Sequence, residues 1–259
     1  MRAEELAGFR KWFARYAGSF RSPDVEYRKS IALKVRHTFK VCENMRLITR
    51  GEGVDGGDAL VAEAIALFHD VGRFPQYDRY RTFMDSRSVD HGALGAEVLA
   101  GEGVLGGLAP AERDLIVAAV RRHNAFSLAG PGDERELFFL KLVRDADKLD
   151  IWRVFVEIYE GRDVARAAVL GLPDNGRYSP EVLARLKAGA QASIAGMRTL
   201  DDFRLVQLSW AYDLNFRTSF RLLLERDYIA RILARLPRER EIDEAAAALR
   251  AYAEGKAAG

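Results

Sequence analysis

The residues of this chain with the clearest capacity for chemistry are its histidines, of which there are only four: His37, His69, His91 and His123. His69 is followed directly by Asp70 at the end of an apolar run, and further aspartates occur near position 147. Imidazole and carboxylate ligands without thiolate suit Mn, Fe, Co, Ni or Zn, and they leave coordination positions open for water. A bound metal ion lowers the pKa of that water. The set therefore predicts one metal-bearing pocket with hydrolytic chemistry.

Each of these residues has an ordinary explanation when it is taken alone. A single histidine on an apolar helix face, such as His37, is more often a satisfied core residue than a ligand, and one His-Asp dipeptide is a weak signal. The combination is what favours a metal site. Every histidine falls in or at the edge of a predicted helix, and buried carboxylates follow soon after the last of them.

Helical periodicity predicts the elements that position these side chains. His37 lies midway along a helix predicted over 23–50, and a helix over 58–71 ends in the His69-Asp70 pair, with Gly72 as its C-cap. Adjacent helical side chains diverge by about 100°, so both members of the pair reach one ion only where the chain is turning. The negative end of the helix dipole at that point favours a cation.

The remaining ligand candidates belong to three further helices. His91 lies in a helix over 89–100, His123 in one that starts at Pro110, and the aspartates in one over 134–160. The last helix is apolar nearly all round, so its carboxylates need a cation or hydrogen-bond donors. The carboxylates concerned are Asp145, Asp147 and Asp150.

The rest of the chain also follows a helical pattern, with no strand pattern of any length, which predicts an all-α fold. Helices are expected over 4–19, over 199–226 with Thr199 and Asp202 at its start, and over 239–252, before a frayed tail. Pro23, Pro110 and Pro180 each suit the first position of a helix. Irregular segments are expected over 73–88 and 127–133, and short helices over 161–200. We expect an N-terminal helix (1–22), a compact helical core (23–160) and a helical C-terminal extension of the same domain (161–259).

Composition limits the classes of function. The formal net charge is only +2, so no bulk field favours a nucleic-acid polymer or an anionic membrane. No apolar run reaches membrane-spanning length, and the acidic N-terminus does not resemble a signal peptide. The single cysteine, Cys42, excludes an internal disulfide and a cysteine-zinc cage. A cytoplasmic protein is expected.

Three segments together resemble the H…HD…D signature of the HD-domain superfamily of metal-dependent phosphohydrolases: His37, the run from Leu67 to Arg73, and the run from Asp145 to Asp150. The resemblance covers roughly residues 24–160, and it implies an all-α fold with a metal ion held by His37, His69, Asp70 and Asp147. Periodicity does not choose between Asp145 and Asp147. The superfamily's Ala-Asp-x-Leu pattern favours Asp147, which leaves Asp145 to orient a histidine.

The two remaining histidines extend this resemblance. The order H…HD…H…H…D is similar to the members of the superfamily that hold two metal ions, in which the aspartate of the pair bridges them. His91 and His123 would then bind a second ion, or act directly on the phosphate or the leaving group. Arg73 and Lys148 adjoin predicted ligands, and we expect them to contact the substrate phosphate.

The resemblance implies metal-dependent hydrolysis of a phosphate ester by metal-activated water. Because no basic surface for a polymer is apparent, we expect a small phosphorylated substrate, most plausibly a nucleotide. One alternative is a di-iron oxygenase, since some relatives use the same ligands to activate dioxygen. A further alternative is a non-catalytic module that binds a nucleotide or a partner.

Overall fold

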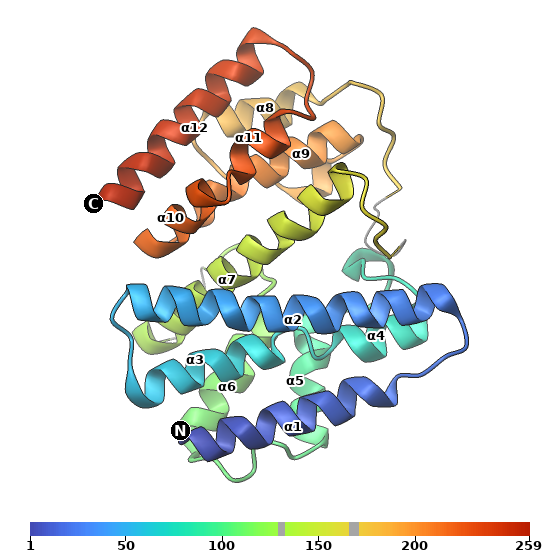
Figure 1. Cartoon of the computed structure of the whole chain (residues 1–259), viewed down its shortest axis with the longest axis vertical. Coiled ribbons are helices and arrows are strands. Elements are labelled where there is room, and N and C mark those ends of the chain that lie inside the picture. Colours follow the sequence, from blue (N-terminus) through green and yellow to red (C-terminus); the bar gives the residue numbers. More distant parts are fainter. Residues whose placement is uncertain (129–132, 166–170) are drawn as a thin grey trace. The chain divides into compact units, whose positions relative to one another are not determined.

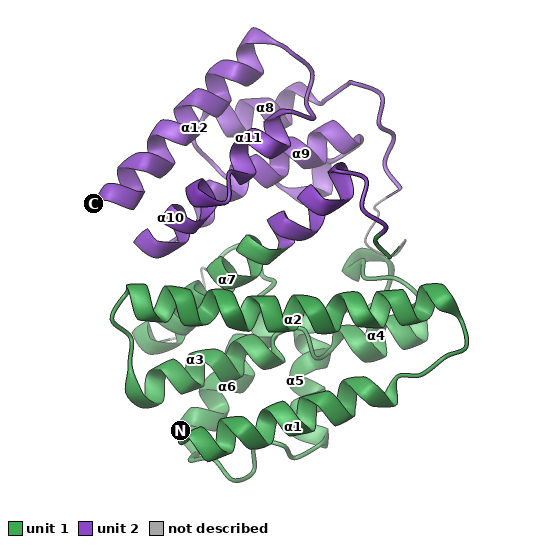
Figure 2. Ribbon diagram, in the orientation of Figure 1, with its two compact units in different colours: residues 1–150, 164–168 green, residues 151–163, 169–259 purple. Residues whose placement is uncertain are grey.

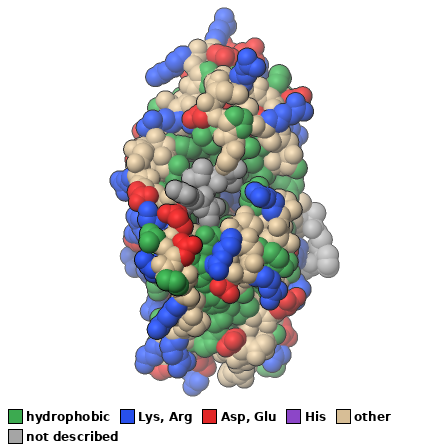
Figure 3. Space-filling model, turned by 90° about the vertical axis from the view of Figure 1, so that its right-hand side faces the viewer, with side chains coloured by type: hydrophobic (Ala, Val, Ile, Leu, Met, Phe, Trp, Pro, Cys, Tyr) green, Lys and Arg blue, Asp and Glu red, His purple; other side chains and the backbone are tan. Residues whose placement is uncertain are grey.

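The computed structural model describes residues 1–128, 133–165 and 171–259, and all regular elements in that part of the chain are helices (Figure 1). The predicted all-α fold is confirmed. No helix among the described residues is long and apolar enough to cross a lipid bilayer. On the face that Figure 3 draws, Lys and Arg side chains are interspersed with Asp and Glu side chains.

The chain divides into two compact units, and the division falls between Asp150 and Ile151 (Figure 2). The first unit contains residues 1–150 with Val164 and Ala165, and the second contains 151–163 and the described residues from Gly171 onward. The boundaries expected at 22/23 and 160/161 stay predictions.

The first unit carries all the predicted site residues. Its helices are α1 (Ala3–Ser19), α2 (Val25–Gly51), α3 (Gly56–Phe68), α4 (Arg73–Tyr80), α5 (His91–Gly101), α6 (Pro110–Arg122) and the first part of α7 (Glu134–Tyr159). Pro110 is the first residue of α6, as its position in the sequence predicts.

The long helix α2 (Val25–Gly51) begins two residues later than Pro23 predicts. Asp24 is the N-cap, because its carboxylate accepts hydrogen bonds from the backbone of Glu26 (2.7 Å) and Tyr27 (3.1 Å). Such a cap stabilises a helix by about 1 kcal/mol. Farther along α2, the buried amide of Asn44 donates to the carbonyl of Ala146 (2.9 Å), which fixes α2 against α7 beside Asp147.

The interior of the first unit is centred on α3. Every residue from Val61 to Phe68 is buried, and α3 packs against α1, α2 and α6. A helix that is apolar nearly all round has no face for water, so its neighbours must cover it on several sides. The chain emerges from this helix at His69, inside the unit.

Two segments of the first unit, 73–88 and 127–133, were predicted to be irregular. Residues 73–80 form α4 instead of a loop, because Pro75 lies in the first turn, where a helix does not need its missing N–H. The helix ends at Arg81, whose φ of 55° is left-handed, and a 3-10 turn follows at Asp85–Arg87. Within the expected loop 127–133, residues 129–132 lie outside the described residues.

The second unit contains the end of α7 followed by α8 (Pro180–Lys187), α9 (Leu200–Ser209), α10 (Arg217–Glu225), α11 (Tyr228–Leu233) and α12 (Arg240–Ala258). The predicted helix start at Pro180 is confirmed, as is the cap at Thr199, which forms a reciprocal capping box with Asp202. Within the segment 161–200, where short helices were expected, residues 166–170 lie outside the described residues.

The predicted single helix over 199–226 is wrong. A 3-10 turn at Trp210–Asp213 and an extended Leu214 separate α9 from α10. The physical reason is burial: α9 is buried on every side, whereas α10 keeps an exposed face, so the chain reorients between them. The predicted frayed tail is also wrong, since α12 continues to Ala258, and α11 was not predicted.

Candidate metal centre

The His69-Asp70 pair lies in a tight turn between two helices. Helix α3 ends at Phe68, His69 is its C-cap, and α4 starts at Arg73. The side chains of His69 and Asp70 are both buried, with 0% and 3% of the residue exposed. Because the chain turns here, neighbours that would diverge along a helix both face the same interior region.

Gly72 does not cap α3, which corrects the sequence prediction. Its φ is −68°, so it needs no left-handed conformation, and it directly precedes α4. A Cβ at this position would collide with the carbonyl oxygen of His91 and would lie 2.6 Å from the backbone nitrogen of Gly95. The absence of a side chain at Gly72 lets the start of α5, and with it His91, approach the turn that carries Asp70.

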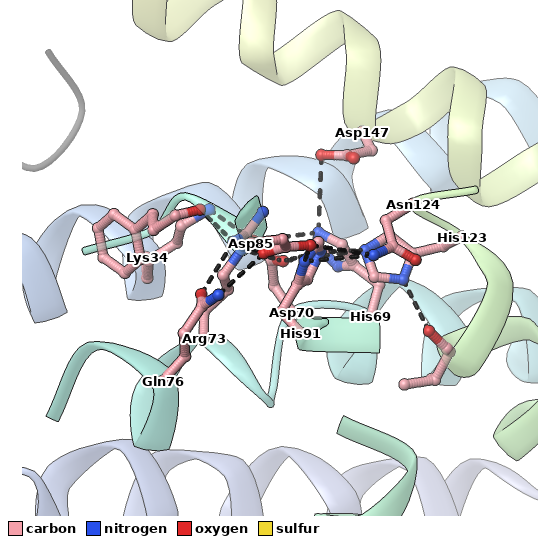
Figure 4. Close-up of polar contacts among 12 residues, drawn as sticks. Lys34, His69, Asp70, Arg73, Gln76, Asp85, His91, His123, Asn124 and Asp147 are labelled. Carbon is pink, nitrogen blue, oxygen red and sulfur yellow. Dashed lines mark hydrogen bonds and ion pairs between the residues drawn. The ribbon is translucent and has the colours of Figure 1, made fainter. Parts of the chain in front are cut away.

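The first group of potential ligands surrounds the Nε2 atom of His37, which comes from the middle of α2. The Nε2 atom of His69 lies 3.2 Å from it, Oδ2 of Asp70 3.3 Å and Oδ1 of Asp147 3.0 Å. Asp147 reaches this point from α7 (Figure 4). Two imidazoles and two carboxylates therefore present their ligand atoms to one small volume.

The second group forms on the other oxygen of Asp70. Its Oδ1 lies 3.4 Å from Nε2 of His91 and 3.9 Å from Nε2 of His123, and the two imidazole nitrogens are 3.0 Å apart. His91 is the first residue of α5, and His123 is the C-cap of α6. The structure thus brings together all six ligand candidates, and Asp70 offers one oxygen to each group.

All four imidazoles are anchored in the same way. The Nδ1 atoms lie 2.6–2.8 Å from an acceptor, while the Nε2 atoms face the cluster. The acceptors are Asp150 Oδ2 for His37, the Ala66 carbonyl for His69, Asp85 Oδ2 for His91 and the Val120 carbonyl for His123. An Nδ1–H that donates outward selects the tautomer with its lone pair on Nε2, which is the form that binds a metal ion. The proton positions on the rings follow from these partners.

The donor set fits a divalent metal ion. Since Nδ1 of both His91 and His123 donates to an acceptor, their Nε2 lone pairs face each other without a proton between them. Oδ1 of Asp147 is buried and faces two imidazole nitrogens, Nε2 of His37 at 3.0 Å and Nε2 of His69 at 3.6 Å. Buried polar atoms of this kind are costly unless they are paired, and a cation would satisfy them.

The electrostatics differ between the two groups. Burial and Lys34 lower the pKa of His37, but hydrogen bonds with Asp147, Asp150 and Asp70 outweigh them and raise the pKa to about 10. Burial, together with the neighbouring imidazoles, lowers the pKa of His123 to about 3. Burial and the guanidinium of Arg73 also lower the pKa of His91.

Both carboxylates of the cluster are strongly acidic. Burial opposes ionisation of Asp70, but Lys34 and His69 outweigh it and hold its pKa well below the ordinary value. Burial also opposes ionisation of Asp147. Its contacts with His37 and His69 outweigh burial and hold the pKa of Asp147 well below the ordinary value. Both groups are therefore charged at neutral pH, as metal ligands must be.

Three residues to which the sequence pattern assigned no specific role support the cluster. Asp150, rather than Asp145, is the acceptor that orients His37. Lys34 donates to Oδ2 of Asp70 (2.7 Å), and its ammonium lies 5.1 Å from the centre of the Phe83 ring. The spacing offered a signal for two of them: Lys34 lies three residues before His37, and Asp150 three after Asp147, so each shares a helix face with a ligand.

Asp85 is the third such residue, and it links several parts of the site. One of its oxygens contacts Nδ1 of His91 (2.6 Å), and the other accepts from Arg73 (2.7 Å) and from Gln76 (2.8 Å). The amide of Asn124 also donates to Oδ2 of Asp85, the oxygen that contacts His91, at 3.2 Å. These contacts hold the pKa of the Asp85 carboxyl far below its usual range, although burial opposes them. Nothing in the periodicity of the segment 73–88 indicated this role.

The two predicted substrate-binding residues have different surroundings. Arg73 lies at the edge of the cluster. Its Nε atom is 3.4 Å from Oδ1 of Asp70, and its Nη1 atom forms an ion pair with Oδ1 of Asp85 (Figure 4). Lys148 is buried in α7, next to Asp147. Their contact with a substrate stays a prediction.

Comparison with protein families places this cluster in a known context. The family model for the HD domain matches residues 35–152, a segment that begins just before His37 and ends just after Asp150. Residues 35–152 form an HD domain. The predicted superfamily is therefore confirmed, and HD domains are typically metal-dependent hydrolases. Searches of curated proteins and of solved structures found no match.

Proposed function

We propose that the HD domain hydrolyses a phosphate ester of a small molecule, in a reaction that depends on divalent metal ions. The observation that carries this proposal is the position of Asp70, whose two oxygens face two separate groups of imidazoles. A carboxylate shared in this way is the arrangement expected of a two-metal site.

His37, His69, Asp147 and Oδ2 of Asp70 would hold one ion, and His91, His123 and Oδ1 of Asp70 would hold the other. When bound, Mn, Fe, Co, Ni or Zn would supply an activated water molecule and offset charge on the phosphoryl oxygens. The chain itself supplies orientation. Asp150 and Asp85 fix two of the imidazole rings, and the 69–72 turn fixes the aspartate between the groups.

We propose that two cations of the chain bind the phosphate. Lys34 contacts Oδ2 of Asp70, and Arg73 lies beside Oδ1 of the same carboxylate. Ion binding at Asp70 would offset the charge that holds them there, which lets both cations turn to an anionic substrate. Lys148 is proposed as a third contact because it is adjacent to Asp147.

A nucleotide is the substrate class that we favour. The net charge of +2 and the interspersed surface charges in Figure 3 support a small substrate over a nucleic-acid polymer. We also propose that the protein acts in the cytoplasm.

The direct test is metal analysis of the purified protein, followed by a screen for phosphate release from nucleotides and other phosphate esters. Asp70→Ala removes the carboxylate common to both groups, so metal content and activity should fall together, with activity reduced more than about a hundredfold. Asp114→Ala, an exposed aspartate on α6, is the matched control and should retain both.

Other outcomes would contradict the proposal. Full phosphate release by Asp70→Ala would exclude the metal centre as its origin. Stoichiometric iron with oxygen-dependent turnover and no phosphate release would indicate the oxygenase alternative. Tight nucleotide binding by metal-loaded protein without any turnover would indicate a binding module.

A further inference from the structure

A second concave site lies in the first unit, on the side of α2 that faces away from His37. This groove between α1, α2 and α3 has a volume of about 720 Å³ and is lined by Arg10, Arg36, Phe39, Lys40, Cys42, Glu43, Arg46, Glu63 and Leu67. None of the six ligand candidates is among these residues. Figure 1 shows the three helices that form its walls.

The floor of the groove is built around a buried carboxylate. Glu63 belongs to the buried face of α3, with 8% of its side chain exposed. A single oxygen of this carboxylate, Oε1, accepts hydrogen bonds from Arg10 of α1 and from Arg46 of α2, the latter at 2.6 Å. One arginine would neutralise Glu63, so the second leaves a net positive charge at the floor.

Both guanidinium groups keep donors for a ligand. Arg10 and Arg46 each use one N–H group on Glu63, and neither has another acceptor among the described residues. A guanidinium carries five N–H groups in a planar fork that matches phosphate and carboxylate oxygens. Each side chain is 47% exposed, so the remaining donors are open to the groove and to water.

An aromatic ring lines the same groove as these cations. Phe39 is 45% exposed although it is a large apolar side chain, and its ring packs edge-on against Phe13 at 5.8 Å. The edge contact holds Phe39 in place while leaving part of its ring uncovered. A fixed, exposed ring in the same groove as two arginines suits a ligand that has both a planar group and a phosphate.

We propose that this groove binds a small organic phosphate with an aromatic group, of the nucleoside monophosphate class, at a site separate from the metal centre. Arg10 and Arg46 bind the phosphate, Phe39 stacks against the planar group, and Glu63 holds the two guanidinium groups at a fixed spacing. The volume of the groove is within the range of small-molecule sites.

The test uses AMP as the probe, with inorganic phosphate and adenosine as comparisons, and isothermal titration calorimetry in the Asp70→Ala background. Either substitution, Arg10→Gln or Arg46→Gln, should weaken AMP binding about tenfold or more, because each variant loses a charge-assisted contact with the phosphate. Phe39→Ala should weaken AMP binding but not phosphate binding. Arg15→Gln, an exposed arginine on α1 outside the groove, is the matched control and should bind AMP normally.

The single-arginine variants keep one guanidinium on Glu63, so the buried carboxylate stays paired. Unchanged AMP affinity in both arginine variants, or phosphate binding as tight as AMP binding, would each overturn the proposal.

Discussion

The two ligand groups at Asp70 use the same residue types but differ in charge. The group around His37 has two further carboxylates, Asp147 and Asp150, in contact with one imidazole, and the pKa of that imidazole is raised to about 10. In the group of His91 and His123, Asp85 contacts one imidazole at 2.6 Å, and burial lowers the pKa of both imidazoles.

This difference indicates that the two groups meet a metal ion in different states. His37 carries a proton in the metal-free protein at neutral pH, and that proton must leave before an ion can bind. His91 and His123 are already neutral, and their Nε2 lone pairs already face each other at 3.0 Å. The second group is therefore prepared for a cation, whereas the first must exchange a proton for one.

Removing one ligand from each group tests the difference between the two groups most directly. His37→Ala should lose the ion of its own group and keep the other, and His123→Ala should do the reverse. Each should reduce phosphate release more than about a hundredfold, because both ions act on one phosphoryl group. Metal content after dialysis is the measurement. Loss of both ions from either variant would show that the groups bind as one unit.

Removing the supporting carboxylates should have a smaller effect. Asp150→Asn and Asp85→Asn each keep the shape of the side chain but remove the charge behind one imidazole, which typically costs 10- to 100-fold in metal affinity. Competition with a chelator measures this affinity for each group. Asp58→Asn, an exposed aspartate paired with Arg135, is the control. Equal weakening of both groups by one variant would contradict the assignment of these carboxylates.

The smallest expected effect is proton release. At pH 7 to 8 the raised pKa keeps His37 protonated, so binding of an ion to its group should release about one proton and become tighter as pH rises toward 10. His123, with a pKa of about 3, has no proton to release in this range. Calorimetry in buffers of different ionisation enthalpy measures the proton count. The same count in His37→Ala would disprove the assignment to His37.

Much of the fold followed from local rules. Periodicity located the main helices of the first unit. The helix start at Pro110 and the cap at Thr199 were predicted correctly, because they depend on backbone groups within one turn. Helix α4 was missed because it has only eight residues and few of them are apolar, so it shows little periodicity. The division of 199–226 was missed because it depends on which faces other helices cover.

The sequence by itself determined the chemistry of the cluster: four imidazoles, the His69-Asp70 pair, aspartates in an apolar helix, and no thiolate. It also showed the superfamily signature. Only the tertiary structure decided that each oxygen of Asp70 faces a different pair of histidines, that Asp150 rather than Asp145 orients His37, and that Asp85 and Lys34 take part. These outcomes depend on distances between atoms from different helices, and Gly72 sets one of them by allowing the backbones to approach. No local sequence pattern encodes such a distance.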